Sequence, residues 1–524
     1  MIRMRKAIIT LMLLSLVVSL SGVSTAASTP KSKTGVYYEI FVRSFNDSNG
    51  DGIGDLKGVT AKLDYLKSLG VKGIWLMPIT ASPSYHGYDT TDYYKINPDY
   101  GTTADLKALV TAAHKKDIKI IMDLVVNHTS SQHPWFVDAS TNPASKYRDY
   151  FVFATEDDDI DAQSATGAGN AWHSAATGKY LGIFWSGMPD WNFNNKAVRA
   201  EMVKIGQYWL DPKIAGVDGY RLDAAKHIYE DFAEQNKTKA NERGVAWWQE
   251  FRTGLNKVNK NAYLVGEIWD GPSVVAPYLN KALNSGFNFE IGKSIVENAK
   301  SGSDGGVGFI LNRVHEYFKK QSGGTFVDAP FLTNHDQTRV MSELEGNVNK
   351  AKVAASMLLT LPGNPFVYYG EEIGMQGLKS DGDEALRTPF LWTAKKSKGQ
   401  TTVMEGYGDQ ATGINVETQL KSSSSLLNHY KKMIGWRNAD YTLSDGTIGE
   451  YTISDTTVAA WTRSANKKNT LVLHNLTSKT KTITINGSDN TMKFKKVSKQ
   501  TGTGAKVSGN KVTIPAYSTV LMSQ

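Results

Sequence analysis

Short apolar runs alternate with amphipathic helical patterns over the first four-fifths of the chain. Residues 119–126 (KIIMDLVV) are typical of a buried strand, whereas Leu63, Leu66 and Leu69 have helical spacing within residues 59–69. Repeated strand–helix units predict a parallel sheet, and eight such units suggest closure into a barrel. The predicted strands are residues 36–45, 72–78, 119–126, 217–224, 263–269, 286–289, 330–335 and 365–369.

Two regions depart from this alternation. Residues 127–190 mix Gly, Asp, Asn and aromatic residues, and a structureless loop of that length is uncommon, so we expect a small inserted domain after the third strand. After a helical pattern at residues 426–437, short β-branched runs separated by Gly, Asn and Ser predict a C-terminal antiparallel β-sandwich over residues 439–524. The predicted fold is therefore α/β, a (β/α)8 TIM barrel formed by residues 35–126 and 191–438 with these two additions.

The first 27 residues have the three-part pattern of a secretory signal peptide. Residues 1–6 are basic, residues 7–20 are apolar, and residues 24–27 are small. The apolar run is shorter than the ~20 residues that a membrane-spanning helix needs. Val23 also stands where a lipoprotein would carry its lipidated Cys. We expect cleavage after Ala26 or Ala27, export from the cell and no membrane attachment after cleavage.

Composition narrows the chemistry and the partners. The absence of Cys excludes a disulfide scaffold, a thiol nucleophile and a zinc site built on thiolates. The formal net charge of +8 would fall to +5 on loss of Arg3, Arg5 and Lys6 with the signal peptide. This surplus, taken over the whole chain, is too weak and too dispersed to indicate a nucleic-acid partner. A monomer is expected.

Polar and charged residues follow several of the predicted strands directly. Because the active site of a parallel barrel lies at the carboxyl ends of its strands, these residues are expected to converge on one mouth. Each taken alone is more simply a solvated loop charge. Together, however, they make four polar strand ends. They are Asp123, Asn127, His128, Arg221, Asp223, Lys226, His227, Glu267, His335 and Asp336.

Carboxyl groups arranged in this way suit glycoside cleavage, in which one attacks or activates water and the other protonates the leaving oxygen. Strand alternation places Arg221 and Asp223 on the same side, so that the guanidinium would keep Asp223 ionised. Asp223 is therefore the better nucleophile. Glu267, flanked by Ile268 and Trp269, is the better acid.

The chain resembles the α-amylase family of glycoside hydrolases. The family's signature segments occur in order as DLVVNH (123–128), GYRLDAAKH (219–227), GEIW (266–269) and TNHD (333–336). The resemblance implies a retaining mechanism with Asp223 as nucleophile, Glu267 as general acid/base and Asp336 as the third carboxylate. It further implies that other residues bind sugar: Arg221, His128 and His335 beside the scissile bond, Tyr88 as a stacking platform, and Asp383 and Arg387 at the next glucose toward the non-reducing end.

A loop after the first strand carries oxygen side chains at alternate positions. This spacing favours a Ca²⁺ loop over the alternative, an Asx-rich turn after the first strand. The resemblance implies a second calcium ion, held by Asn127 and the backbone of His227. Both ions are expected to be structural and not catalytic. The loop ligands would be Asp47, Asn49, Asp51, Asp55 and the backbone carbonyl of Ile53.

The resemblance also bears on which bond is cleaved. Ala224, directly after the nucleophile, favours α-1,4 linkages, and Lys226 with His227 resembles a pair that α-amylases use on the leaving-group side. Residues 188–193 (MPDWNF) resemble instead a subfamily between oligo-1,6-glucosidases and neopullulanases. An α-amylase that acts on starch and maltooligosaccharides is the expectation. An α-glucosidase, a neopullulanase-like or transglycosylating enzyme, and a non-catalytic carbohydrate-binding relative remain alternatives.

Overall fold

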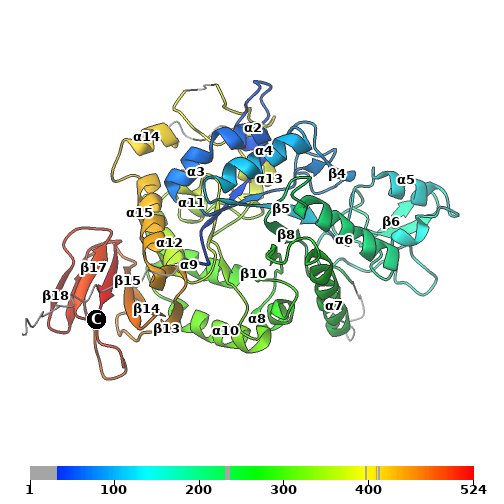
Figure 1. The fold of residues 1–524 in the computed structure, drawn as a ribbon. Coiled ribbons are helices and arrows are strands. Elements are labelled where there is room, and N and C mark those ends of the chain that lie inside the picture. Colours follow the sequence, from blue (N-terminus) through cyan, green and yellow to red (C-terminus); the bar gives the residue numbers. More distant parts are fainter. Residues whose placement is uncertain (1–31, 231–236, 396–397, 409, 411–412) are drawn as a thin grey trace, which may run out of the picture. The chain divides into compact units, whose positions relative to one another are not determined.

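An eight-stranded parallel sheet forms the centre of the structure (Figure 1). The computed structural model describes residues 32–230, 237–395, 398–408, 410 and 413–524, so that the predicted signal peptide lies outside the described residues. The strand order is β12-β1-β2-β5-β8-β9-β10-β11, and a parallel bridge from Phe331 to Phe366 joins the two outer strands. The strands are β1 (Tyr37–Ile40), β2 (Gly73–Leu76), β5 (Lys119–Val125), β8 (Gly219–Asp223), β9 (Tyr263–Gly266), β10 (Ser285–Asn288), β11 (Ala329–Pro330) and β12 (Phe366–Tyr368).

Every predicted barrel strand is present, so the predicted TIM barrel is confirmed. Several strands are shorter than their apolar runs, because residues 42–45 turn into helix α1 (Val42–Phe45) and β11 ends at Pro330. The helix predicted at residues 59–69 is two helices that meet at Lys62. The principal barrel helices are α2 (Leu56–Ala61), α3 (Leu63–Leu69), α4 (Thr103–His114), α6 (Lys196–Leu210), α7 (Lys237–Leu255), α9 (Phe289–Ser301), α10 (Val307–Ser322), α12 (Val348–Thr360) and α15 (Leu426–Ala439).

The interior of the barrel changes from apolar to charged toward the carboxyl ends of the strands. Side chains on one strand face inward at every second residue, so Tyr37 is followed by Glu39 and Ile121 by Asp123. The apolar residues of this interior are mostly large aromatic rings. They are Tyr37, Trp75, Ile121, Tyr263, Val265, Phe287, Ala329, Phe331 and Phe366.

Between β5 and α6 the chain makes a separate substructure. It contains helix α5 (Pro134–Thr141) and a hairpin of β6 (Trp172–Ala175) and β7 (Gly178–Leu181). A small apolar cluster that includes Ala171, Trp172 and Ile183 lies beneath the hairpin. The insertion therefore has a core of its own.

The last part of the chain consists of two antiparallel sheets that enclose a common core. The larger sheet has the order β13-β14-β15-β20-β17, and the smaller one β16-β19-β18. The predicted C-terminal β domain is confirmed. None of the helices in the described part of the chain is long and apolar enough to cross a membrane. The strands are β13 (Thr447–Glu450), β14 (Val458–Ala465), β15 (Lys468–Asn475), β16 (Lys481–Thr484), β17 (Lys496–Gln500), β18 (Lys506–Ser508), β19 (Lys511–Ile514) and β20 (Thr519–Ser523).

Candidate active site

The guanidinium of Arg221 lies at the centre of the polar cluster above the barrel. Its Nη1 is 2.5 Å from Asp223 Oδ1 and 3.0 Å from Asp123 Oδ1, and its Nη2 is 2.7 Å from Glu267 Oε1. Asp123 and Arg221 are opposite each other in the register of β5 and β8, whereas Glu267 directly follows β9. A single buried cation therefore holds three carboxylates from neighbouring strands, which limits how far apart Asp223 and Glu267 can lie.

Glu267 accepts two further hydrogen bonds that fix its orientation. The backbone N–H of Ala224 donates to Oε2 at 3.0 Å, and the indole N–H of Trp269 donates to Oε1 at 3.0 Å. Ala224 has a φ of 45°, in the left-handed region that non-glycine residues rarely adopt. Such strain persists where the surroundings impose it, and here it accompanies a turn that points the N–H at a carboxylate.

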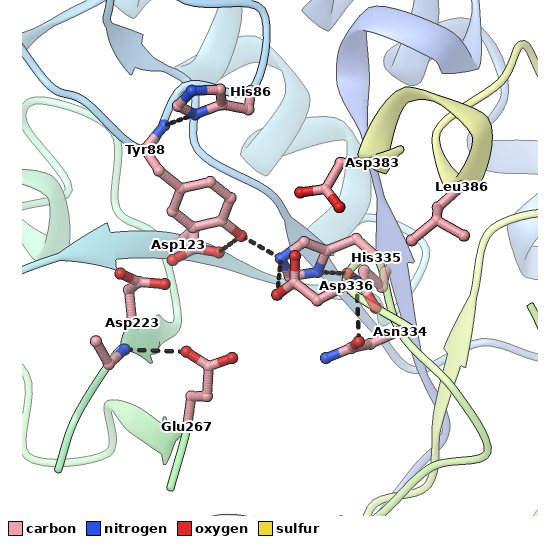
Figure 2. Close-up of polar contacts among 12 residues, drawn as sticks. His86, Tyr88, Asp123, Asp223, Glu267, Asn334, His335, Asp336, Asp383 and Leu386 are labelled. Atoms are coloured by element: carbon pink, nitrogen blue, oxygen red, sulfur yellow. Dashed lines mark hydrogen bonds and ion pairs between the residues drawn. The ribbon is translucent and has the colours of Figure 1, made fainter. Parts of the chain in front are cut away.

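Asp336 faces the other two acids from the opposite side. Its Oδ2 is 3.1 Å from His335 Nε2 and its Oδ1 is 2.9 Å from Arg387 Nη2. The Tyr88 hydroxyl joins the two halves of the site, 2.7 Å from His335 Nε2 and 3.1 Å from Asp123 Oδ2. Figure 2 shows Asp223, Glu267 and Asp336 bordering one space. The three predicted acids are thus brought together.

The acids of the site differ in their proton affinity. Burial, opposed by Arg221, raises the pKa of Asp123 to about 6. Burial together with the charges of Glu267 and Asp123 raises the pKa of Asp223, and Arg221 opposes this shift as well. Burial alone would also raise the pKa of Asp336, but the neighbouring His335 and Arg387 outweigh it and hold that pKa below its ordinary value. Asp336 is therefore the acid most firmly held as an anion.

His335 is the cationic counterpart of this arrangement. Its Nδ1 lies 2.5 Å from Glu39 Oε1, and its other nitrogen contacts Asp336. Burial would lower the pKa of His335, but the charges of Asp336 and Glu39 raise it to about 9. The ring is therefore an imidazolium at neutral pH and stacks against Tyr88 with a centroid separation of 5.5 Å.

The other residues expected to bind substrate divide into two groups. His128 lies beside Tyr88, with Nε2 3.1 Å from the Tyr88 carbonyl, and burial lowers its pKa to about 3, so that the ring is neutral. Asp383 contacts Arg387 at 3.3 Å and therefore joins the Asp336 side. Lys226 and His227 do not contact the three acids: Lys226 pairs with Asp270 at 3.0 Å and His227 with Glu230 at 2.5 Å.

Residues 39–446 match the family model described as "Alpha amylase, catalytic domain". The chain belongs to the α-amylase family. A second model, "Alpha-amylase SusG C-terminal domain", matches residues 458–521. The protein is thus an α-amylase family glycoside hydrolase, as the order of the four signature segments predicted.

Individual relatives extend the similarity over almost the whole chain. "Alpha-amylase 3" of Dictyoglomus thermophilum is 42% identical over 94% of this chain and 94% of its own. A crystal structure of an α-amylase from H. orenii is 44% identical, with a TM-score of 0.84 over 94% of this chain and 100% of its own. A "4-alpha-glucanotransferase" of Thermotoga neapolitana is 34% identical over 78% of this chain and 88% of its own. The chain is therefore similar to hydrolases and to a transferase of this family.

Among the described residues, the side chains of the predicted calcium loop make no hydrogen bond or ion pair with the three acids. Asp47 Oδ1 accepts hydrogen bonds from the N–H groups of Asn49 and Gly50, and Asp55 caps helix α2 by accepting from Gly58 N at 2.7 Å. Asp51 is exposed and accepts from Ile53 N at 2.8 Å. Over the described residues, no group of three or more His, Cys, Asp or Glu side chains is gathered as a metal site. The carboxylates of Asp47, Asp51 and Asp55 accept hydrogen bonds from backbone N–H groups of the loop and of the start of helix α2.

A buried carboxylate beside Asn127 was not singled out from the sequence. Asp190 is 3% exposed, and its Oδ1 has no hydrogen-bond partner. Burial raises the pKa of Asp190 well above its ordinary value. It lines a cavity of about 470 Å³ together with Asn127, His227 and Asp157–Asp159. The orphaned oxygen is the sign of a missing polar partner in this cavity.

Sequence reasoning also missed the residues that orient the site from below. Glu39 lies on β1 and contacts His335, and Trp75 on β2 donates its indole N–H to Asp123 at 3.2 Å. The sequence contained one signal for Glu39, because it is an acid within the apolar alternation of residues 36–45. A buried charge in a strand needs a partner, which in this fold lies 296 positions away in the sequence.

Proposed function

We propose that the protein is an exported α-amylase that hydrolyses α-1,4-glucosidic bonds of starch and maltooligosaccharides with retention of configuration. The observation that supports this proposal best is the contact of one guanidinium with both Asp223 and Glu267, while Asp336 borders the same space. Export is inferred from residues 1–27. The named α-amylase relatives support the choice of reaction.

In the proposed mechanism, an Asp223 oxygen attacks the anomeric carbon and the glycosidic C–O bond breaks. Glu267 donates its proton to the leaving oxygen and then, as a carboxylate, removes a proton from the water that hydrolyses the glycosyl–Asp223 ester. Asp336, held as an anion by His335 and Arg387, accepts hydrogen bonds from sugar hydroxyls. Tyr88 offers a ring face beside the sugar, and Arg221 balances the charge that returns to Asp223 when the ester is cleaved.

The decisive experiment is Glu267→Gln, assayed on maltoheptaose. Because acid/base assistance contributes ~10²–10⁴ in rate, turnover should fall by at least that factor, whereas Glu297→Gln, an exposed change on α9, should leave it unaltered. On an aryl maltoside, azide should accelerate the Glu267 variant and yield the α-glycosyl azide. A β-azide would mean inversion, and full activity of the variant would remove Glu267 from the mechanism.

The 34% identity to a named 4-α-glucanotransferase makes transglycosylation the second candidate. The same glycosyl–enzyme ester can be taken by a sugar hydroxyl in place of water. Time-resolved products from maltotriose with added glucose distinguish the two. Early products longer than the substrate would favour the transferase, and faster turnover of isomaltose than of starch would instead favour an α-1,6-specific enzyme.

The proposal includes structural calcium at residues 47–55 and beside Asn127. Asp47, Asp51 and Asp55 have no ion-pair partner among the described residues, and the orphaned Asp190 adds a carboxylate near the Asn127 amide and the His227 carbonyl. Oxygen donors of this kind suit Ca²⁺, which when bound would cross-link these loops.

Calcium should raise the melting temperature of the chelator-treated protein, because an ion that binds the folded state stabilises it. Asp51→Asn and Asp190→Asn should each remove part of the increase, and Asp64→Asn, an exposed change on α3, should remove none. Calorimetry with and without a chelator measures this. An unchanged melting temperature would contradict both sites.

A further inference from the structure

The charge of the chain is divided unevenly between the C-terminal β domain and the rest of the molecule. Residues 447–524, from the start of β13 onward, contain eleven of the 59 Lys and Arg residues but only three of the 51 acidic residues, Glu450, Asp455 and Asp489. This segment therefore has a formal charge of +8, and the remaining 446 residues have no net charge. The surplus is concentrated in one domain, contrary to the expectation from the whole-chain charge that it is dispersed.

The positive groups of this domain face solvent almost without compensation. Its one arginine, Arg463, is fully buried, but eight of the ten lysines are exposed and the other two, Lys481 and Lys499, are half-buried. Among the residues that the structure describes, Lys481 alone of these ten has an ion-pair partner, Asp455 at 3.8 Å. Lysines that stabilised the fold through ion pairs would show more such partners.

Four of the lysines are brought together at one end of the larger sheet, and we refer to Lys467, Lys468, Lys495 and Lys496 as the lysine end. Lys468 begins β15 after the turn from β14, and Lys496 is paired with Ser523 at the end of β20. The N–H of Lys495 donates to the Ser523 carbonyl at 3.1 Å. Residues almost thirty positions apart thus form one basic patch.

The smaller sheet extends the basic surface. Val507 and Val512 point toward the core of the β domain, so the alternate residues Lys506 and Lys511 lie on the opposite, outer face. The neighbouring positions on that face are Thr and Ser. This face therefore offers cations and hydroxyls but no acid.

The side-chain chemistry favours one class of anionic partner. Lysine supplies flexible point charges, whereas recognition of bases uses arginine forks or aromatic stacking. No large apolar side chain is exposed in the described residues 458–524. These properties suit a flexible chain of phosphate charges that is bound through its backbone, without readout of bases.

We propose that the C-terminal β domain binds a phosphate-bearing polymer of the cell envelope through the lysine end. The location rests on the proposed export of the protein, whereas the binding itself does not. The remainder of the chain has no net charge and would not be attracted to the same polymer, so the barrel would stay free for substrate. The competing explanation is that lysines on the edge strands β17 and β18 only prevent association between sheets.

The test measures binding of the full chain to immobilised poly(glycerol phosphate) over a range of NaCl concentrations. A variant in which Lys467, Lys468, Lys495 and Lys496 are all changed to Gln should bind at least tenfold more weakly. The slope of log affinity against log salt should also fall, because each phosphate contact contributes about one unit. The matched control changes four exposed lysines of the barrel region to Gln, at positions 115, 119, 257 and 260.

Hydrolysis of maltoheptaose is measured on the same samples and should be equal in all three proteins, so that failure of the proposed hydrolase activity would be seen separately. Equal affinity of the parent and the lysine-end variant would overturn the proposal, as would equal loss in the control. Tighter binding to duplex DNA, or to phosphatidylglycerol vesicles, than to the polymer would overturn the choice of partner. No binding at 0.15 M NaCl would overturn the proposal and favour the explanation that the lysines only prevent association between sheets.

Discussion

Arg221 shows how one buried residue counters the effect of burial on the acids around it. It is 1% exposed and contacts three carboxylates, and for Asp123 and Asp223 its charge opposes the rise in pKa that burial causes. Burial would lower the pKa of Arg221, but the charges of Asp123 and Glu267 raise it above its ordinary value, so this guanidinium is a permanent counter-ion. The indole of Trp75 and the hydroxyl of Tyr88 donate to Asp123 and satisfy the remaining oxygen.

A second buried acid lies outside the catalytic mouth. Glu371 is 3% exposed; Tyr430 donates to its Oε1 at 2.7 Å, and its Oε2 has no partner. Burial raises the pKa of Glu371 to about 8, and the neighbouring Glu372 adds to the shift. The folded state therefore holds a proton that the unfolded state releases near pH 4.3, so this residue costs stability as the pH rises from that value to about 8.

Glu371→Gln should abolish this dependence, because the amide keeps the contact with Tyr430 and cannot ionise. Relative to the parent, the free energy of unfolding should gain about 1.4 kcal/mol per pH unit between pH 5 and 7. Chemical denaturation at several pH values measures this, with Glu297→Gln as the exposed control. Parallel curves for parent and variant would contradict the assignment. His335, with its raised pKa, adds a loss of stability between pH 6.5 and about 9 that both proteins share.

At the scale of elements, helix α4 illustrates how the local sequence determines where a helix begins. Thr102 precedes the helix, its hydroxyl accepts from Asp105 N at 3.2 Å, and Asp105 accepts from Thr102 N at 3.0 Å. This reciprocal cap satisfies N–H groups that have no partner within the helix. The sequence contains the pattern, so the start of α4 is a local property.

Thr102→Ala should therefore destabilise the protein by about 1 kcal/mol, the usual cost of losing an N-cap. Thr111→Ala, an exposed change in the middle of the same helix, is the matched control and should cost less, because alanine favours the helix interior. Melting temperatures of both variants, measured by calorimetry, make the comparison. Equal losses would show that the cap contributes nothing beyond the side chain itself.

At the scale of the whole molecule, two buried arginines lie at the junction of the barrel and the C-terminal β domain, and Arg463 connects these two parts. Arg437 on α15 donates to the carbonyls of Leu361 at 2.5 Å and Gly363 at 2.6 Å, just beyond the end of α12. Arg463 on β14 donates to Thr360, the last residue of α12, and to Gly446 at 2.7 Å. Burial lowers the pKa of both, yet cations at a helix C-terminus are favourable.

Arg463→Ala should cost about 3 kcal/mol, since it leaves buried carbonyls unpaired on both sides of the junction. We expect the β domain to unfold before the barrel, so that the calorimetric transition splits in two. Activity on maltoheptaose at 25 °C should remain, because the carbonyls of Thr360 and Gly446 that Arg463 contacts are not part of the candidate active site. Arg313→Ala, an exposed change on α10, is the control. One unshifted transition would contradict this function of Arg463.

The sequence by itself determined the barrel, the β domain and the three acids at strand ends. Burial periodicity and turn residues act over a few positions, and the carboxyl ends of parallel strands must share one side of a sheet. The sequence also contains Asp190 within residues 188–193, a segment that resembles a known subfamily. It did not indicate that one oxygen of this buried carboxylate lacks a hydrogen-bond partner.

Only the tertiary structure decided which distant groups meet. Glu39 contacts His335 and Arg463 contacts Thr360 although these residues are far apart in the chain. Pairing with β20 likewise places Lys468 and Lys496 at the same end of the larger sheet. Closure of the barrel and the register of the sheets bring these residues together, and no local sequence pattern encodes these pairings. The same distinction applies to charge. The total charge follows from composition, whereas the concentration of positive charge on one surface depends on how the β strands pair.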